Sequence, residues 1–222
     1  PAFTGKTHEG KMVPSPKAKH QTKDASLLHL AVQNCNGLRK EAYKCRLANA
    51  MDAESIDVCC LTETHLPTTQ SERWDSGHTV LTSGMVQPKR GRGTQGVGAC
   101  LSQKAVAWHE AAGSRFVAIN SRFATFRLLI GTTTLYFVVW YAPTSDATPD
   151  ARQNNLDLLS DLTDKCGANE ILLIMTDANA ATGPSSEQDC VCGPHSSPHE
   201  NIPGTHLRTL LAMHELYAPI TY

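Results

Sequence analysis

Short apolar runs alternate with helical repeats along most of the chain. Runs rich in Val, Leu, Phe and Thr predict buried strands. These expected strands cover residues 26–33, 56–61, 96–101, 115–120, 123–130, 133–141, 171–175 and 216–222. Apolar residues at helical spacing predict helices over about 38–52, 149–166 and 204–214. The mixture, with several strands at the short intervals typical of antiparallel neighbours, indicates an α/β protein with mixed sheets.

The first 25 residues lack this periodicity. They carry five Lys, two acidic residues and three Pro. We therefore expect residues 1–25 to form an extended basic arm, which is either solvated, wrapped on a partner or in contact with nucleic acid. Residues 26–222 are expected to form one domain, since compact domains reach roughly 250 residues before they split.

Composition narrows the class of protein. The 222 residues are 41% hydrophobic and 18% charged, with a formal net charge of −1. This is enough apolar material for a core, and the charge excludes a globally basic nucleic-acid binder. The sequence offers no apolar run near the roughly 18 residues of a membrane span. Eight cysteines, several of them in strand-like or helix-like runs, and the lack of a glycosylation sequon or signal peptide predict free thiols in a reducing, intracellular compartment.

Polar residues that directly follow apolar strands are the candidates for chemistry, because strand ends meet at the edge of a sheet. Four expected strands end in this way, with Asn34 and Asn36, Glu63, Tyr141, and Asp177 and Asn179. Carboxylate and amide oxygens suit a hard cation such as Mg²⁺ together with a phosphate. A single acid in such a place means little, since Asp and Asn also favour turns.

Five short motifs occur in an order that resembles the endonuclease/exonuclease/phosphatase superfamily. They are Val32–Leu38 (VQNCNGL), Leu61–Leu66 (LTETHL), Gly96–Gly98 (GVG), Tyr141–Pro143 (YAP) and Thr176–Asn179 (TDAN). The resemblance covers about residues 27–222 and is strongest to the apurinic-type endonuclease domains of non-LTR (LINE-type) retrotransposons and their craniofacial-development-like relatives. It implies a four-layer α/β sandwich of two mixed β-sheets flanked by helices.

The resemblance also implies a function and a site. The function is Mg²⁺-dependent hydrolysis of phosphodiesters, with Mn²⁺ as a substitute and DNA as the partner. Glu63 matches the metal-binding Glu of the family, and Asn36 the Asn beside the metal. Tyr141 matches the Tyr that hydrogen-bonds the scissile phosphate. Asp177 matches the Asp that positions or deprotonates the attacking water, and Asn179 the Asn that holds the phosphate.

The sequence departs from the family in two places. The family's GDFN motif reads Thr176-Asp-Ala-Asn179 here, and the chain ends at Tyr222, before the family's last motifs, which supply another Asp and the catalytic His. The domain is therefore expected to be truncated before its last motif, and whether it is an enzyme stays open, with a metal-dependent endonuclease favoured. The alternative is a catalytically inactive, domesticated copy that serves as a structural or interaction subunit with protein partners. A phosphatase or deadenylase on the same scaffold is a third reading. An active retroelement nuclease implies a nuclear location, and an organelle stays open.

Three other signals are weaker. Gly91–Gly96 matches G-x-G-x-x-G but lacks the strand–loop–helix context of a dinucleotide site. Lys89–Arg92 suits a nucleic-acid backbone as well as a solvated hairpin tip. A group of Cys and His residues has poor spacing for zinc and is expected to be incidental. Its members are Cys190, Cys192, His195 and His199. His65, directly after the Glu63 motif, is expected to be structural.

Overall fold

The computed structural model describes residues 27–84, 95–144, 146–184, 191–193 and 195–219. The predicted arm and the Lys89–Arg92 segment lie outside these ranges. In the described residues the first sheet has five strands in the order β1-β2-β5-β4-β3. Their bounds are Leu30–Asn34 (β1), Val58–Thr62 (β2), Gln70–Arg73 (β3), Thr79–Thr82 (β4) and Gly98–Leu101 (β5). β1 and β2 are parallel and the remaining pairs are antiparallel, so this sheet is mixed.

The second sheet follows in the chain and has four strands in the order β6-β7-β8-β9. Their bounds are Phe116–Ala118 (β6), Phe123–Ile130 (β7), Thr133–Tyr141 (β8) and Glu170–Asp177 (β9). β6, β7 and β8 pair antiparallel, whereas β8 and β9 pair in parallel over their whole length. The helices of the described residues are Glu41–Ala53 (α1), Gln103–Ala111 (α2), Pro149–Thr163 (α3) and Ile202–Met213 (α4).

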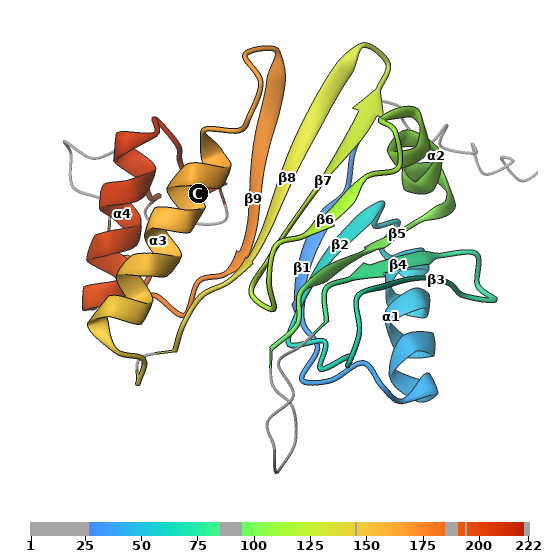
Figure 1. Cartoon of the computed structure of the whole chain (residues 1–222), viewed down its shortest axis with the longest axis horizontal. Coiled ribbons are helices and arrows are strands. Elements are labelled where there is room, and N and C mark those ends of the chain that lie inside the picture. Colours follow the sequence, from blue (N-terminus) through green and yellow to red (C-terminus); the bar gives the residue numbers. More distant parts are fainter. Residues whose placement is uncertain (1–26, 85–94, 145, 185–190, 194, 220–222) are drawn as a thin grey trace, which may run out of the picture.

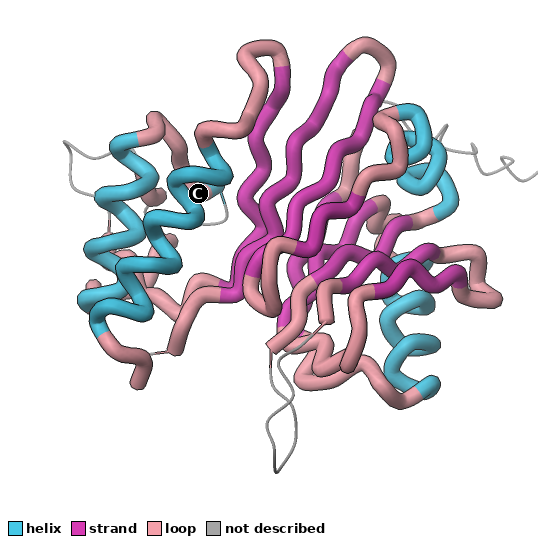
Figure 2. Tube along the Cα trace, in the orientation of Figure 1, coloured by secondary structure: helices cyan, strands magenta, loops and turns pink. Residues whose placement is uncertain are grey.

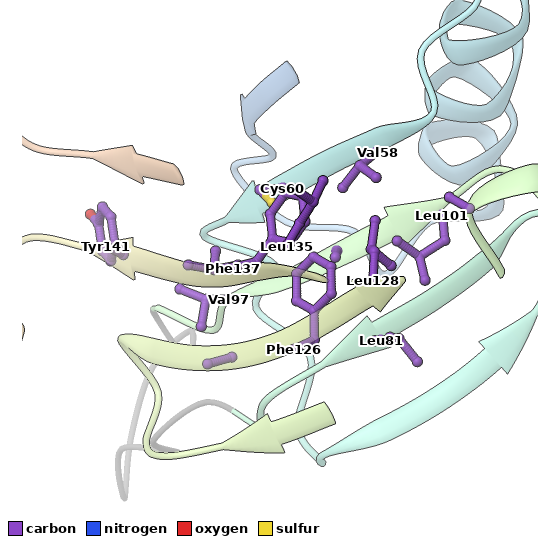
Figure 3. Close-up of a cluster of buried hydrophobic side chains, with 14 residues drawn as sticks. Val58, Cys60, Leu81, Val97, Leu101, Phe126, Leu128, Leu135, Phe137 and Tyr141 are labelled. Carbon is purple, nitrogen blue, oxygen red and sulfur yellow. The ribbon is translucent and has the colours of Figure 1, made fainter. Parts of the chain in front are cut away.

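The two sheets pack face to face between helices, as predicted (Figure 1; Figure 2). β2 and β8 are nearly continuous apolar runs whose successive side chains point to opposite faces, so each strand buries side chains on both of its faces. Phe137, on the inner face of β8, stacks on Phe126 of β7 with the ring centres 4.5 Å apart. Figure 3 shows this inter-sheet core, with Tyr141 at one end of it. α2 lies against the core through Ala105 and Trp108.

Helices cover the two outer faces. α1 packs Ala48 and Met51 on the outer face of β2, and α3 and α4 pack Leu residues on the outer face of β8. Pro149 and the Thr148 cap start α3, and Asn201 caps α4. The result is a helix–sheet–sheet–helix sandwich (Figure 1). No helix in the described ranges is long and apolar enough to cross a membrane.

Several predicted boundaries were wrong. The first helix starts at Glu41 rather than 38, because Gly37 and Leu38 donate their amides to the loop after β2. In the described residues, which begin at 27, strand β1 starts at Leu30 rather than at the predicted residue 26. Residues 216–219 are not a strand, since Ala218 forms only an isolated bridge with Cys192. β3, β4 and α2 were not predicted.

Candidate active site

Two pairs of parallel strands bring their carboxyl ends to the same edge of the sandwich. β1 and β2 form one pair, and β8 and β9 form the other, with Tyr141 in register with Asp177. β2 contacts both β8 and β9 across the interface between the sheets, and β1 contacts β9. Side chains at these four strand ends therefore come from both sheets and lie at one rim, as the sequence predicted.

Asn34, the last residue of β1, lies between two carboxylates. Its Nδ2 donates to Glu63 Oε1 at 3.0 Å and to Asp177 Oδ2 at 3.0 Å. The two acids belong to different sheets, so this amide joins the sheets at the rim. An amide nitrogen has two N–H groups, and both are used here on charged acceptors.

Tyr141 completes the arrangement from the end of β8. Its hydroxyl donates to Glu63 Oε1 at 2.7 Å, the oxygen that also accepts from Asn34. Burial and this hydrogen bond to a carboxylate raise the pKa of Tyr141 to about 12. The phenol is therefore protonated at neutral pH and remains a hydrogen-bond donor.

Glu63 has a lowered pKa despite its partial burial. Burial acts to raise the pKa, but hydrogen bonds from Asn34 and Tyr141 favour the carboxylate and lower it. His65, only 5% exposed, adds to the lowering with its Nε2 3.5 Å from Glu63 Oε2. This contact favours the ionised form of Glu63, and the structural role of His65 stays a prediction.

Several of these residues have a backbone conformation that L-residues rarely adopt. The φ angles of Asn36, Glu63, His65 and Asn179 lie between 44° and 53°. Asn often adopts this region, but a Glu there costs free energy that the surroundings must offset. The amide of Gly37 holds this turn by donating to the Glu63 carbonyl at 2.8 Å. Strain of this kind is typical of functional sites.

Asn179 lies two residues after Asp177, in the loop that follows β9. Its amide N–H points to Asp177 Oδ1 at 3.4 Å, and its Nδ2 donates to the Ala142 carbonyl at 3.0 Å. Ala142 in turn donates its N–H to the Asp177 carbonyl at 3.0 Å. These bonds hold the segment after β9 against the end of β8.

Asn34 and Asn36 lie at different places relative to the two carboxylates. The sequence placed Asn36 beside the metal, yet the residue between the carboxylates is Asn34, and the Asn36 amide N–H donates to Asn34 Oδ1 at 3.1 Å. The signal that could have found Asn34 was present, because it is the last residue of an apolar strand. The role of Asn36 beside the metal stays a prediction.

Arg122, which was not predicted from the sequence, lies beside Tyr141. Its guanidinium lies over the Tyr141 ring, 4.9 Å from the ring centre, and donates to the Tyr141 and Ala142 carbonyls at 3.1 and 3.0 Å. It therefore fixes the end of β8, from which the tyrosine hydroxyl reaches Glu63. A lone Arg before a strand carries no sequence signal of such a role.

The donor set at the rim fits a hard divalent cation. Two carboxylates, Glu63 and Asp177, lie on either side of the Asn34 side-chain amide, and Mg²⁺ is commonly bound through one or two carboxylates plus waters and substrate phosphates. A closed, all-protein metal centre is not seen, since no group of three or more His, Cys, Asp or Glu in the described ranges could hold a metal. This includes Cys192, His195 and His199. Cys190 lies outside the described residues.

A two-sheet α/β sandwich with acids, amides and a tyrosine at the strand ends has the fold of the endonuclease/exonuclease/phosphatase proteins. Solved structures with this fold are similar to the chain. The endonuclease domain of TRAS1, a telomere-specific non-LTR retrotransposon, is 11% identical with a TM-score of 0.53, covering 85% of this chain and 71% of that one. The AP endonuclease LMAP from Leishmania major is 15% identical with a TM-score of 0.55, covering 86% and 71%. The 3′ phosphatase NExo from Neisseria, bound to a product DNA hairpin, is 14% identical with a TM-score of 0.55, covering 84% and 71%.

At these identities the likeness establishes the fold, as the sequence motifs predicted. No protein-family model matches the sequence, and no curated protein matches it either.

Proposed function

We propose that this protein is a divalent-metal-dependent phosphodiester hydrolase that nicks DNA. The observation that carries the proposal is the Asn34 amide held between Glu63 and Asp177, with the Tyr141 hydroxyl on the same Glu63 oxygen. It places two acids and two donors at one rim from strands of both sheets. The similar folds of a retrotransposon endonuclease, AP endonucleases and a DNA phosphatase support DNA as the substrate.

Glu63 would hold the metal, with Asn36 beside it, as the family resemblance implies. Mg²⁺ is the expected ion and Mn²⁺ a substitute, since both prefer oxygen ligands. When bound, the cation would neutralise charge on the non-bridging oxygens of the phosphate.

The chain's own residues supply the remaining chemistry. Asp177 orients the attacking water and accepts its proton, which a carboxylate at hydrogen-bond distance can do. The Tyr141 hydroxyl, protonated at neutral pH, turns its single O–H from Glu63 to a phosphate oxygen as negative charge builds up there. The Asn179 amide serves as a second donor, held in place by its bond to Ala142.

The proposal places the protein with DNA in a reducing, intracellular compartment, which is the nucleus for a retroelement enzyme. The cysteines that the structure describes are free thiols, which supports a reducing environment.

Supercoiled plasmid nicking tests the proposal. The wild-type chain should nick with Mg²⁺ and not with EDTA, and Asp177→Ala or Glu63→Gln should lower the rate by at least about 100-fold. Asp161→Ala, an exposed acid on α3, is the matched control and should nick like the wild type. A folded wild-type chain that nicks nothing with Mg²⁺ or Mn²⁺ would refute the nuclease and favour an inactive copy. Release of phosphate from a 3′-phosphorylated oligonucleotide, or shortening of poly(A), without nicking would favour the phosphatase or deadenylase.

A further inference from the structure

A cavity lies away from the rim, near the start of β2, the end of α1 and the start of α2. It has a volume of about 550 Å³, which is within the usual range for small-molecule sites. Its apolar side includes Leu27, Met51 and Ile56. The nuclease proposal makes no use of it.

Three polar residues of this cavity form a chain of contacts. Ser76, in the turn between β3 and β4, has its Oγ 3.0 Å from His78 Nδ1. His78 Nε2 lies 3.6 Å from Asp52 Oδ1 near the end of α1. His78 is only 3% exposed, whereas Ser76 is open to solvent. The serine is thus accessible to a reactant, and the imidazole behind it is shielded.

The order of these contacts is that of an activated nucleophile. A neutral His78 that carries its proton on Nε2 directs it to Asp52 and leaves Nδ1 to accept from the Ser76 hydroxyl. A serine and a base within hydrogen-bond reach, with a carboxylate beyond the base, is the arrangement that activates serine hydrolases on unrelated folds. The 3.6 Å contact is long, and catalytic hydrogen bonds are often long before a ligand is bound.

A donor for a developing oxyanion lies beside this serine. Gly77, with φ at +86°, is next to Ser76, and a Cβ built there would overlap Gln103 Nε2. The Gln103 amide therefore reaches the turn only because residue 77 has no side chain. Gln103 and Ser76 both line the cavity.

We propose that Ser76 is an activated serine that reacts with carboxylic esters bearing a small apolar acyl group. Its Oγ attacks the ester carbonyl and forms a new C–O bond, while the hydroxyl proton passes to His78 Nδ1. The C–O bond to the alcohol then breaks, and the alcohol leaves with that proton. Water attacks the acyl-serine with His78 as base, which releases the acid and regenerates Ser76. Gln103 stabilises the oxyanion, and Asp52 is a positioning residue that holds the imidazole.

The test uses the whole chain with p-nitrophenyl acetate and with a fluorophosphonate, which transfers its phosphorus group to an activated serine and releases fluoride. Peptide mass spectrometry should find the label on Ser76, formed at least about 100-fold faster than on any other serine. Ser76→Ala should abolish the label and the esterase rate. Ser71→Ala, an exposed serine on β3, is the matched control and should change neither.

Two further variants separate activation from mere exposure. His78→Gln keeps a hydrogen-bond acceptor near Ser76 but removes the base, and should slow labelling by about 100-fold or more. If that buried substitution unfolds the chain, the exposed Asp52→Asn should still slow labelling, because it removes the carboxylate that holds the His78 imidazole. Labelling of Ser76 no faster than that of other serines, or a rate that does not change in any folded variant, would overturn the proposal. Glu63→Gln should leave labelling intact, so this result is independent of nicking.

Discussion

Replacing Asn34 by Asp tests the bridging role of this amide. A carboxylate there would lie about 3 Å from both Glu63 and Asp177, the distance that each hydrogen bond now spans. Two unit charges 3 Å apart repel by about 1.4 kcal/mol in water and by more in a less polar medium. Two such repulsions give about 3 kcal/mol, and the lost hydrogen bonds add to it. Without divalent cations at pH 7, Asn34→Asp should therefore lower the free energy of unfolding by roughly 1 to 3 kcal/mol, because the exposed side chain can turn toward solvent and relieve part of the repulsion.

The cluster of three carboxylates in Asn34→Asp also determines how the free energy of unfolding depends on pH. Mutual repulsion raises the pKa of clustered carboxylates in the folded chain, so the deficit grows as pH rises through those values and shrinks near pH 4. Mg²⁺ should recover more stability for Asn34→Asp than for the wild type, since binding to the folded state stabilises it and a third carboxylate strengthens binding. Urea denaturation followed by tryptophan fluorescence at pH 7 and pH 4, with EDTA or Mg²⁺, measures these effects.

Asn36→Asp is the matched control, because it adds the same charge two residues later, in the loop after β1. It should cost less than half as much at pH 7. An unfolding free energy for Asn34→Asp within about 0.5 kcal/mol of the wild type, or a larger loss for Asn36→Asp, would show that Asn34 does not bridge the two acids.

Three other substitutions have expected outcomes. Phe137→Ala removes a fully buried ring from between the sheets and should cost about 3 to 5 kcal/mol in urea denaturation. Tyr141→Phe removes a donor to Glu63 and should raise the pKa of that carboxyl, which carboxyl-detected NMR titration measures. The stability that the Glu63 carboxylate contributes should then be lost at a higher pH on acidification. Gly204→Ala should destabilise the chain in thermal denaturation, although Ala favours helices, because its Cβ would overlap the Ala181 carbonyl.

Contrary results are equally clear. A cost for Phe137→Ala as small as that of Ile171→Ala, a residue 51% exposed at the edge of the sheet, would contradict the packing of the two sheets. An unchanged pKa of Glu63 in Tyr141→Phe would mean that the phenol does not donate to it. A rise in melting temperature for Gly204→Ala would mean that α4 lies farther from residue 181.

The bounds of strands and helices were predicted best where the local sequence alone favours the observed element. The boundaries of β7 and β8 were predicted as observed, because these strands are rich in β-branched, aromatic and other apolar residues and are separated by the short turn at Gly131. β3 was missed because its residues Gln70–Arg73 are all polar and pair only at the edge of the sheet. α2 was missed because it is short and weakly amphipathic, and its start depends on the Ser102 hydroxyl accepting from the Ala105 N–H.

The candidate site shows the same division. That Glu63, Tyr141 and Asp177 meet could be predicted, because each follows a strand whose end lies at one rim. Asn34 was recognised as a strand-end residue but was not assigned a role, since only the three-dimensional arrangement shows which amide lies between the acids. Arg122 could not have been found, because its partners are backbone carbonyls that no sequence pattern marks.

The split of the site between two sheets has a consequence for how the protein is made. The five-stranded sheet is built from residues 30–101 and the four-stranded sheet from residues 116–177. Asn34 and Asp177, which share a hydrogen bond, are 143 residues apart in the sequence. During synthesis, which proceeds from the N-terminus, the first sheet can pair its strands long before β9 exists. Asn34 and Glu63 are then in place at the rim of the first sheet before their partner is made. The rim gains its second carboxylate, Asp177, only after β9 has left the ribosome and docked.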